Sequence, residues 1–365
     1  MCIFDSIGVC RNTEIYKWDG NVVKSSRTFL PISPDKTTQI SAVESAIDEE
    51  ISLVTRSHPE LDAWCSGGID SSTIAYLHNI KGRKAELLTL SYGQALIASY
   101  GEGEIPHART MATACGMPLR TVEMEEELFK KVHTSFVTGH HSPVIDTCLL
   151  AKYALASATR KAAVTGEGGD PIFGGVKNDF VSYYRYRNPS VSIGQIYSLS
   201  HKRFGPNLPD IMVRGSELNQ FSAEYFQNLF ELYPGDLIRQ LFYLNTFEKQ
   251  GGMIFPESYY PTKRSGVRIF HPLTSRRVYE VAFSLTDEKR YVYPNGKLVL
   301  ESLYRDKLPS SIVNREKSGT QIPLRAYLSA LPRSIFKLDS LRSLEFIRED
   351  FLDAATDGRL TIDKE

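Results

Sequence analysis

The fold of this chain is decided by residues 61–77, which read Leu-Asp-Ala-Trp-Cys-Ser-Gly-Gly-Ile-Asp-Ser-Ser-Thr-Ile-Ala-Tyr-Leu. The stretch begins with a short run that predicts a buried strand, turns through two glycines and enters a helix at about Ser71. Glycine lets the backbone approach a ligand closely, and the start of a helix directs free N–H groups and the positive end of the helix dipole outward. The stretch therefore predicts an anion site, most simply for a phosphate.

The side chains of this loop refine the prediction. The hydroxyls of Ser66, Ser71 and Ser72 add hydrogen-bond donors. Asp70 would repel a phosphate unless a cation lay between them, so the loop predicts a phosphate accompanied by Mg²⁺. No lysine follows the glycines, so this is not the Gly-x-x-x-x-Gly-Lys-Ser/Thr loop.

Composition narrows the class of protein. The chain has 365 residues, enough for one large core or two modest ones. Lys and Arg number 43 and so do Asp and Glu, which argues against a general nucleic-acid or membrane-surface binder. The cysteines show no Cys-x-x-Cys spacing and indicate neither a zinc site nor a disulfide framework; they are Cys2, Cys10, Cys65, Cys115 and Cys148. Because no signal peptide and no membrane-spanning run is visible, we expect a cytoplasmic protein without membrane or nucleic-acid partners.

Strands and helices alternate between about residues 61 and 170. Strands are expected at 61–65, 86–92, 119–123 and 162–165, and helices at 40–56, 71–80, 105–115, 125–136 and 146–161. Such alternation implies an α/β fold, in which helices cover both faces of a parallel sheet.

The second half of the chain shows no clear strand. Residues 235–250, 275–285 and 297–307 read as helices, with loops at Gly251-Gly252 and at Pro294-Asn295-Gly296. We expect a short N-terminal segment at 1–38, an α/β core at 39–180 and a mostly helical C-terminal lobe at 181–365.

A second glycine-rich loop follows the strand at 162–165 and reads Gly-Glu-Gly-Gly-Asp-Pro-Ile-Phe-Gly-Gly over Gly166–Gly175. In open parallel sheets, ligands bind beyond the carboxyl ends of the strands. Both glycine-rich loops come at such ends, so they can converge on one ligand. Asp70 and Asp170 could then hold one Mg²⁺ between them. The plainer alternative for an isolated aspartate is a helix cap.

These motifs carry a family resemblance. Ser66–Ser71 resembles the pyrophosphate loop of the ATP pyrophosphatase superfamily, which implies an adenine nucleotide alpha-hydrolase-like fold and cleavage of ATP between its α- and β-phosphates. Gly166–Gly175 resembles the synthetase domain of class B asparagine synthetases and of their β-lactam-forming and lasso-peptide-cyclising relatives. Three later runs agree with it: Phe270–Val278, Gly296-Lys297 and Leu308–Lys317. Because order and spacing match from about residue 40 to 325, the chain is identified as a member of this family.

The resemblance implies roles for individual residues. Asp70 and Asp170 would hold the Mg²⁺ that bridges the pyrophosphate, and Glu167 would face the adenylate and the reacting acyl group. Lys317 would stabilise the anionic intermediate that forms when the amine attacks. The nucleotide is expected at Trp64, Cys65, Ser66, Gly67, Gly68, Asp70, Ser71, Ser72, Leu90, Gly166 and Gly168.

Several of these residues have plainer interpretations. Cys65 reads as a small buried residue rather than a nucleophile, and Lys297 matches a helix-start position for which a supporting role is expected. A lone lysine such as Lys317 is usually a solvated surface charge, and its place in the motif is what argues for catalysis. The adjacent His140 and His141 show no metal spacing and read as loop residues.

Two departures from the family pattern bear on the substrates. Full asparagine synthetases carry an N-terminal domain whose freed cysteine hydrolyses glutamine. This chain begins Met1-Cys2, yet the phosphate loop starts as early as Ser66, so we expect Cys2 to be ordinary and ammonia from glutamine to need a separate subunit. Asparagine synthetases usually carry Asp-Glu where this chain has Asp170-Pro171, which puts an aspartate substrate in doubt.

We therefore expect an ATP-dependent, AMP-forming amide-bond synthetase that adenylates a carboxylate and transfers the acyl group to an amine or ammonia. ATP and Mg²⁺ are the expected cofactors, and small-molecule or peptide carboxylates and amines are the expected substrates. An intramolecular lactam- or macrolactam-forming cyclase and a catalytically decayed nucleotide-binding homologue stay open as alternatives. A sulfur- or tRNA-modifying enzyme is disfavoured because neither a Cys-x-x-Cys pair nor a basic face is present. The acid, the amine and the oligomeric state, with a homodimer among the options, are left open.

Overall fold

The structure is a computed structural model. It describes residues 14–18, 23–27, 31–80, 85–93, 96–97, 101–139, 148–175, 178–200, 208–316, 322–329, 342 and 347–356. Contacts group the chain into two compact units, one comprising Met1–Val176 with Phe242–Ala330 and the other Lys177–Leu241 with Leu331–Glu365. The division into three parts at residues 38 and 180 stays a prediction.

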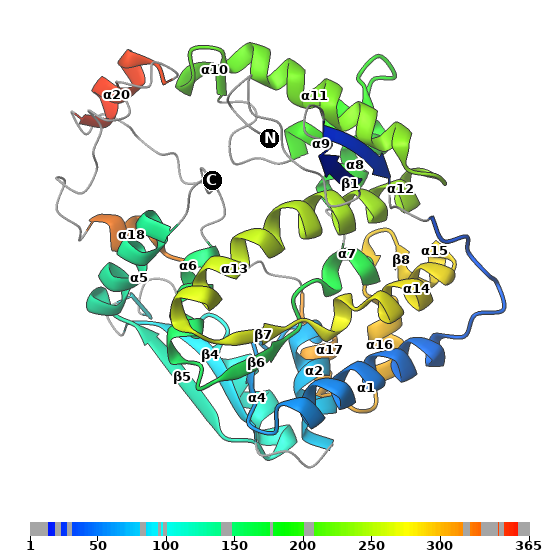
Figure 1. The fold of residues 1–365 in the computed structure, drawn as a ribbon, viewed down its shortest axis with the longest axis vertical. Helices are drawn as coiled ribbons and strands as arrows, with labels where there is room; N and C mark the ends of the chain where they lie inside the picture. The colour runs from blue at the N-terminus through cyan, green and yellow to red at the C-terminus, as the bar shows by residue number, and fades with distance from the viewer. Residues whose placement is uncertain are drawn as a thin grey trace. The chain divides into compact units, whose positions relative to one another are not determined.

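The first unit is built on a five-stranded parallel sheet (Figure 1). In spatial order its strands are β5 (Leu119–Met124), β4 (Glu86–Tyr92), β3 (Asp62–Trp64), β6 (Ala162–Thr165) and β7 (Arg268–Phe270). Four of them lie within a residue or two of the predicted ranges, and their parallel pairing confirms the α/β fold. The strand β7 escapes the sequence prediction because it is only three residues long and begins with an exposed arginine.

Helices cover both faces of this sheet. They are α1 (Ile40–Ser57), α2 (Ile69–Ile80), α4 (Ile105–Cys115), α5 (Glu126–Gly139), α6 (Cys148–Ala158) and α13 (Phe255–Ser265). The helix α2 connects β3 to β4 and α4 connects β4 to β5, so both connections run toward the β5 edge of the sheet. The connections that include α6 and α13 lead to β6 and then to β7, and run toward the opposite edge. Because parallel crossovers are right-handed, the two groups lie on opposite faces.

The strand interiors are packed on both sides, as their apolar runs predict. Leu87, Leu88, Ala163 and Val164 are fully enclosed. Burying apolar surface of this kind contributes about 25 cal/mol for each Å² removed from water. The sheet is therefore a firm platform, and its carboxyl edge is where the two glycine-rich loops begin.

A continuous helical run occupies the place of the loop predicted at Gly251-Gly252, so that prediction is wrong. The helix α12 (Leu237–Leu244) continues as a π-helix, η1 (Asn245–Ile254), and then as α13. The π-helix is a wider turn that stays hydrogen-bonded through both glycines, so their low helix propensity does not end the run.

The remaining described elements complete the two units. In the first unit they are β1 (Glu14–Trp18), β2 (Val23–Arg27), α7 (Gly169–Phe173), η2 (Pro272–Thr274), α14 (Arg276–Ser284), α15 (Asp287–Arg290), β8 (Tyr291–Val292), β9 (Asn295–Gly296), α16 (Leu298–Tyr304), α17 (Ser310–Val313) and α18 (Leu324–Ser329). In the second unit they are α8 (Asn178–Tyr186), α9 (Ile193–Ser200), α10 (Leu208–Ile211), α11 (Gly215–Leu232) and α20 (Glu349–Thr356). In the part of the chain that the structure describes, no helix has both the length and the apolar character needed to cross a membrane.

Candidate active site

A buried lysine joins the two predicted metal-binding aspartates. Asp70 lies in the first turn of α2 and Asp170 in the first turn of α7. The Nζ atom of Lys297 lies 2.6 Å from each carboxylate oxygen of Asp70 and 2.8 Å from Oδ1 of Asp170. The fold thus brings together three charged side chains that are far apart in the sequence.

The backbone around Lys297 explains how its side chain reaches this place. Lys297 has a φ of 65°, a left-handed conformation that non-glycine residues rarely adopt, and its N–H donates to the carbonyl oxygen of Phe173 at 2.9 Å. A Cβ atom on Gly175 would lie 2.2 Å from Oδ1 of Asp170 and 2.8 Å from Cε of Lys297, so these two side chains would have to shift to admit one. The β8–β9 hairpin and the end of α7 together position the lysine between the carboxylates.

One lysine and two carboxylates set the charge of this cluster. Burial alone lowers the pKa of Lys297, but the carboxylates of Asp170 and Asp70 outweigh burial and raise it above its ordinary value. The ammonium therefore stays charged, and the two carboxylates face a common positive charge. Carboxylate oxygens are also the donors that Mg²⁺ prefers, and Mg²⁺ commonly uses one or two of them and takes its other ligands from water and phosphate. Asp70 and Asp170 therefore fit Mg²⁺, although no group of three or more His, Cys, Asp or Glu side chains gathers among the described residues.

The phosphate loop is braced by its own hydroxyls. The backbone N–H of Ser66 donates to Oγ of Ser71 at 3.2 Å, and that hydroxyl donates to the carbonyl oxygen of Gly68 at 3.1 Å. Gly67 has a φ of 69°, and a Cβ atom there would lie 2.2 Å from Cβ of His107. Arg315 donates to the carbonyl oxygen of Ser66 at 2.9 Å. These contacts hold the loop in one shape.

The three predicted hydroxyl donors differ in their surroundings. Those of Ser66 and Ser71 lie 3.1 Å apart and hydrogen-bond each other within the loop. Ser72 is fully enclosed, and its backbone N–H donates to the carbonyl oxygen of Gly68 at 2.9 Å. Contact between these hydroxyls and a phosphate stays a prediction.

The other predicted nucleotide positions line the carboxyl edge of the sheet. Leu90 is buried in β4, and the buried Cys65 follows β3, with its N–H donating to Leu88 at 2.8 Å. Burial raises the pKa of the Cys65 thiol to about 11, which agrees with a small buried residue and not with a nucleophile. A Cβ atom on Gly166 would lie 2.4 Å from the backbone nitrogen of Ser71, so the two glycine-rich loops touch at a point where only glycine fits.

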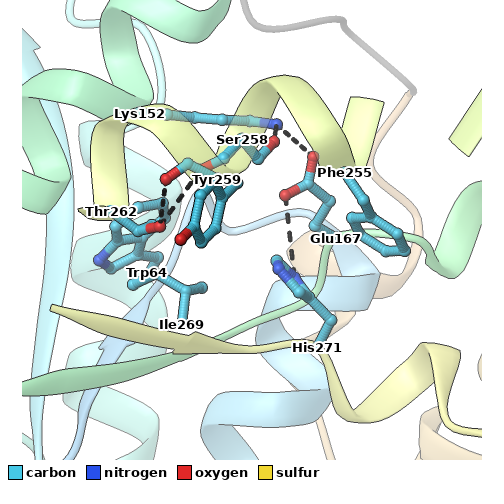
Figure 2. Close-up of a pocket in the computed structure, with 9 residues that line it drawn as sticks. All are labelled: Trp64, Lys152, Glu167, Phe255, Ser258, Tyr259, Thr262, Ile269 and His271. Carbon is cyan, nitrogen blue, oxygen red and sulfur yellow. Dashed lines mark hydrogen bonds and ion pairs between the residues drawn. The ribbon is translucent and has the colours of Figure 1, made fainter. Parts of the chain in front are cut away.

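Glu167 belongs to a cluster of charged and polar side chains (Figure 2). It forms an ion pair with Lys152 of α6, whose ammonium also donates to Oγ of Ser258 at 2.6 Å. On its other side, Oε2 of Glu167 lies 3.8 Å from Nδ1 of His271, and the same ring nitrogen hydrogen-bonds Thr165 at 2.9 Å. Burial lowers the pKa of His271, Glu167 raises it and Lys152 lowers it further, so the ring is neutral at neutral pH.

The cluster lies at the wall of a cavity of about 200 Å³. The lining residues come from β3, α6, the loop after β6, α13, β7 and the residue that follows it. They are Trp64, Lys152, Glu167, Phe255, Ser258, Tyr259, Thr262, Ile269 and His271. Figure 2 shows the rings of Trp64, Phe255 and Tyr259 around this space.

Part of this arrangement could not be predicted from the sequence. Lys152 and Ser258 are single polar residues within helices, and no local pattern marks them. His271 stands inside the motif Phe270–Val278, which was the available signal. Gly168 has a φ of 88°, and a Cβ atom there would lie 2.0 Å from Cγ2 of Thr274. A glycine is therefore needed at this position for steric reasons.

Some predicted residues lie outside the described ones. They are Lys317, His140, His141 and Cys2. Their predicted roles stay predictions.

Comparison with known proteins supports the family resemblance. Residues 42–363 match the protein family described as asparagine synthase. The chain belongs to the asparagine synthase family. The match spans both glycine-rich loops, Lys297 and the residues that line the cavity. It confirms the family resemblance.

Individual relatives in this family are distant. The chain is 22% identical over 341 residues to asparagine synthetase [glutamine-hydrolyzing] 1 of Bacillus subtilis, covering 82% of this chain and 52% of that protein. It is 23% identical over 346 residues to a putative asparagine synthetase [glutamine-hydrolyzing] of Mycobacterium bovis, covering 82% and 51%. A shorter match, 30% identical over 157 residues, is to amidase chry2 of Gibberella zeae and covers 39% of this chain and 23% of that protein. The chain thus spans about half the length of the two synthetases.

Proposed function

We propose that this chain is an ATP-dependent, AMP-forming amide-bond synthetase. It activates a carboxylate as an acyl-adenylate and passes the acyl group to an amine or to ammonia. The observation that carries the proposal is the meeting of Asp70 and Asp170 at the ammonium of Lys297, with Glu167 on the same loop as Asp170. Membership of the asparagine synthase family supports the same chemistry.

The first step forms the acyl-adenylate. A carboxylate oxygen of the substrate attacks the α-phosphorus of ATP, a new P–O bond forms, and the bond between the α-phosphorus and the bridging oxygen breaks. The loop Ser66–Ser72 and Lys297 hold the departing pyrophosphate. Asp70 and Asp170 would hold Mg²⁺, which when bound supplies positive charge to the leaving pyrophosphate.

The second step forms the amide. The amine nitrogen attacks the carbonyl carbon of the acyl-adenylate, AMP leaves with the electrons of the C–O bond, and the nitrogen gives up a proton. We place Glu167 as the acceptor of that proton, held in position by Lys152 and beside the neutral His271. Lys317 stabilises the negative charge on the intermediate.

Exchange of labelled pyrophosphate into ATP tests the first step without knowledge of the amine. We expect exchange that depends on one or a few members of a panel of carboxylic acids. Asp70→Asn and Asp170→Asn should each reduce it at least about 100-fold, because each removes a carboxylate that would hold Mg²⁺ against the pyrophosphate. The exposed Asp306→Asn is the matched control and should leave exchange unchanged.

Other outcomes of this experiment separate the alternatives. Absence of exchange with every acid, from folded protein that binds ATP, would contradict the proposal and favour a decayed nucleotide-binding homologue. A lactam- or macrolactam-forming cyclase shares the first step, so it would show exchange and then release its product without an added amine. A separate ammonia-supplying subunit, a homodimer and a cytoplasmic location stay predictions.

A further inference from the structure

We infer that the cavity of Figure 2 binds the body of the carboxylic acid substrate, and that this body is an uncharged aromatic or branched aliphatic group. The inference rests on the proposed function, because it names the class of acid that the same site activates. It excludes acids such as aspartate, in which the group that bears the reacting carboxyl also bears a second carboxylate and an ammonium.

The position of the cavity supports this assignment. Trp64 is the last residue of β3 and directly precedes the phosphate loop, while Glu167 lies three residues before Asp170. His271 follows the end of β7, which runs parallel to β6. The cavity is therefore bounded by the carboxyl edges of the strands from which both glycine-rich loops begin. The inference places the carboxyl group of a bound ligand toward the place where those loops meet.

The wall of the cavity offers apolar surface. The indole N–H of Trp64 already donates to Oγ1 of Thr159 at 3.0 Å, so its ring presents an apolar face. The hydroxyl of Thr262 donates to the carbonyl oxygen of Tyr259 at 2.8 Å. Phe255 and Ile269 add purely apolar side chains. Aromatic walls of this kind favour a ring that can stack or meet them edge to face.

The charged groups of the cavity are already paired with each other. Among its lining residues Lys152 is the permanently charged cation, and its ammonium is bound to Glu167 and to Ser258. A second carboxylate on the substrate would have to separate Lys152 from Glu167 and leave that glutamate as an uncompensated, largely buried charge. Breaking a buried ion pair in this way is strongly unfavourable, so the cavity discriminates against charged bodies.

The size of the cavity sets the size of the group. A cavity of about 150 Å³ lined by Leu, Ile and Phe is enough to bind benzene. The volume of about 200 Å³ here therefore suits a single aromatic ring or a branched aliphatic group of similar bulk. A fused ring system would require one of the lining side chains to move.

The experiment compares matched acids in the pyrophosphate exchange assay. We expect phenylacetate, 3-phenylpropionate or isovalerate to give a kcat/KM at least about 10-fold higher than aspartate or glutamate, since pocket contacts of this size are worth 10-fold or more. Thr262→Phe fills the cavity and should lower kcat/KM for the aromatic acids at least about 10-fold while sparing acetate. Thr262→Val changes the volume little, so it should lower kcat/KM for these acids less than Thr262→Phe does. A preference for aspartate, or equal loss with both variants, would overturn the inference.

A binding measurement separates this inference from the proposed function. Trp18 and Trp64 are the tryptophans of the chain, so in a Trp18→Phe background the fluorescence reports on Trp64 in the cavity. If no acid supports exchange, the proposed function fails, and the titration still decides the cavity. A saturable response to phenylacetate that Thr262→Phe abolishes would support it, and no response to any acid would overturn it. Phe255→Ala enlarges the cavity and should shift the binding preference toward 2-naphthylacetate. Because this result is a gain of binding, it cannot come from a variant that fails to fold.

Discussion

Replacing Lys297 by methionine removes the cation that lies between Asp70 and Asp170 and keeps most of the side-chain volume. The lysine side chain is 10% exposed, that of Asp70 is 22% exposed and that of Asp170 is 50% exposed. Unit charges about 4 Å apart attract by about 4 kcal/mol at an effective dielectric constant of 20. The cost of desolvating the lysine offsets part of this attraction. The cluster is therefore a strong but solvent-moderated ion triad.

The expected cost of Lys297→Met follows from these exposures. Removing one partner of a fully buried ion pair costs about 3–5 kcal/mol. Because Asp170 is half exposed, water compensates part of the loss, and we expect the free energy of unfolding to fall by about 2–3 kcal/mol. The matched control is Lys307→Met, which loses a partly exposed pair with Glu44 and should cost about 0–1 kcal/mol.

Urea unfolding followed by circular dichroism measures both variants, with the free-energy change taken from the shift in midpoint. Once Lys297 is removed, the carboxylates of Asp70 and Asp170 face each other without a cation. The double variant Lys297→Met with Asp70→Asn removes one of these charges, so its loss of stability should be smaller than the sum of the losses in the two single variants. A cost for Lys297→Met no larger than that for Lys307→Met would show that the lysine does not stabilise the cluster. Additive costs in the double variant would show the same.

Three further predictions concern the loops and the cavity. Gly67→Ala should destabilise the protein by about 1–3 kcal/mol more than Gly101→Ala, as measured by thermal unfolding. Both glycines have a positive φ, but a Cβ atom would clash with His107 at position 67 and would meet nothing within 4 Å at position 101. His271 has a pKa below its ordinary value of 6.5 because of burial, so its neutral form stabilises the folded state above about pH 6.5 and that stability is lost as pH falls. The stability of His271→Gln should therefore fall less than that of the wild type between about pH 7 and pH 5 in urea titrations. Lys317→Ala should reduce amide formation much more than pyrophosphate exchange, and an equal loss of both would contradict its role in the second step.

Features that depend on neighbouring residues could be predicted from the sequence. The loop at Ser66–Ser72 and the strand before it follow from local patterns of glycine, hydroxyl and apolar residues. The same holds for β4 and β6, whose apolar runs mark strands buried on both faces. The family resemblance added the order of the motifs, and the family match confirms it.

Features that depend on the folded chain could not be predicted in the same way. Lys297 is a single lysine after a turn, and its contact with both aspartates arises because the β8–β9 hairpin reaches the end of α7. The strand β7 forms because it pairs with β6, and this pairing is not visible in its own short sequence. The glycines at 251 and 252 suggested a loop, whereas the surrounding helices continue through them as a π-helix.

In the first step that we propose, a carboxylate oxygen of the substrate attacks the α-phosphorus of ATP. The most direct test uses an acid that supports exchange, labelled with ¹⁸O in both carboxylate oxygens, together with ATP and an amine. Mass spectrometry of the nucleotide product should find AMP that carries one ¹⁸O atom for each amide formed. AMP without the label, or ADP as the product, would contradict attack by the carboxylate on the α-phosphorus.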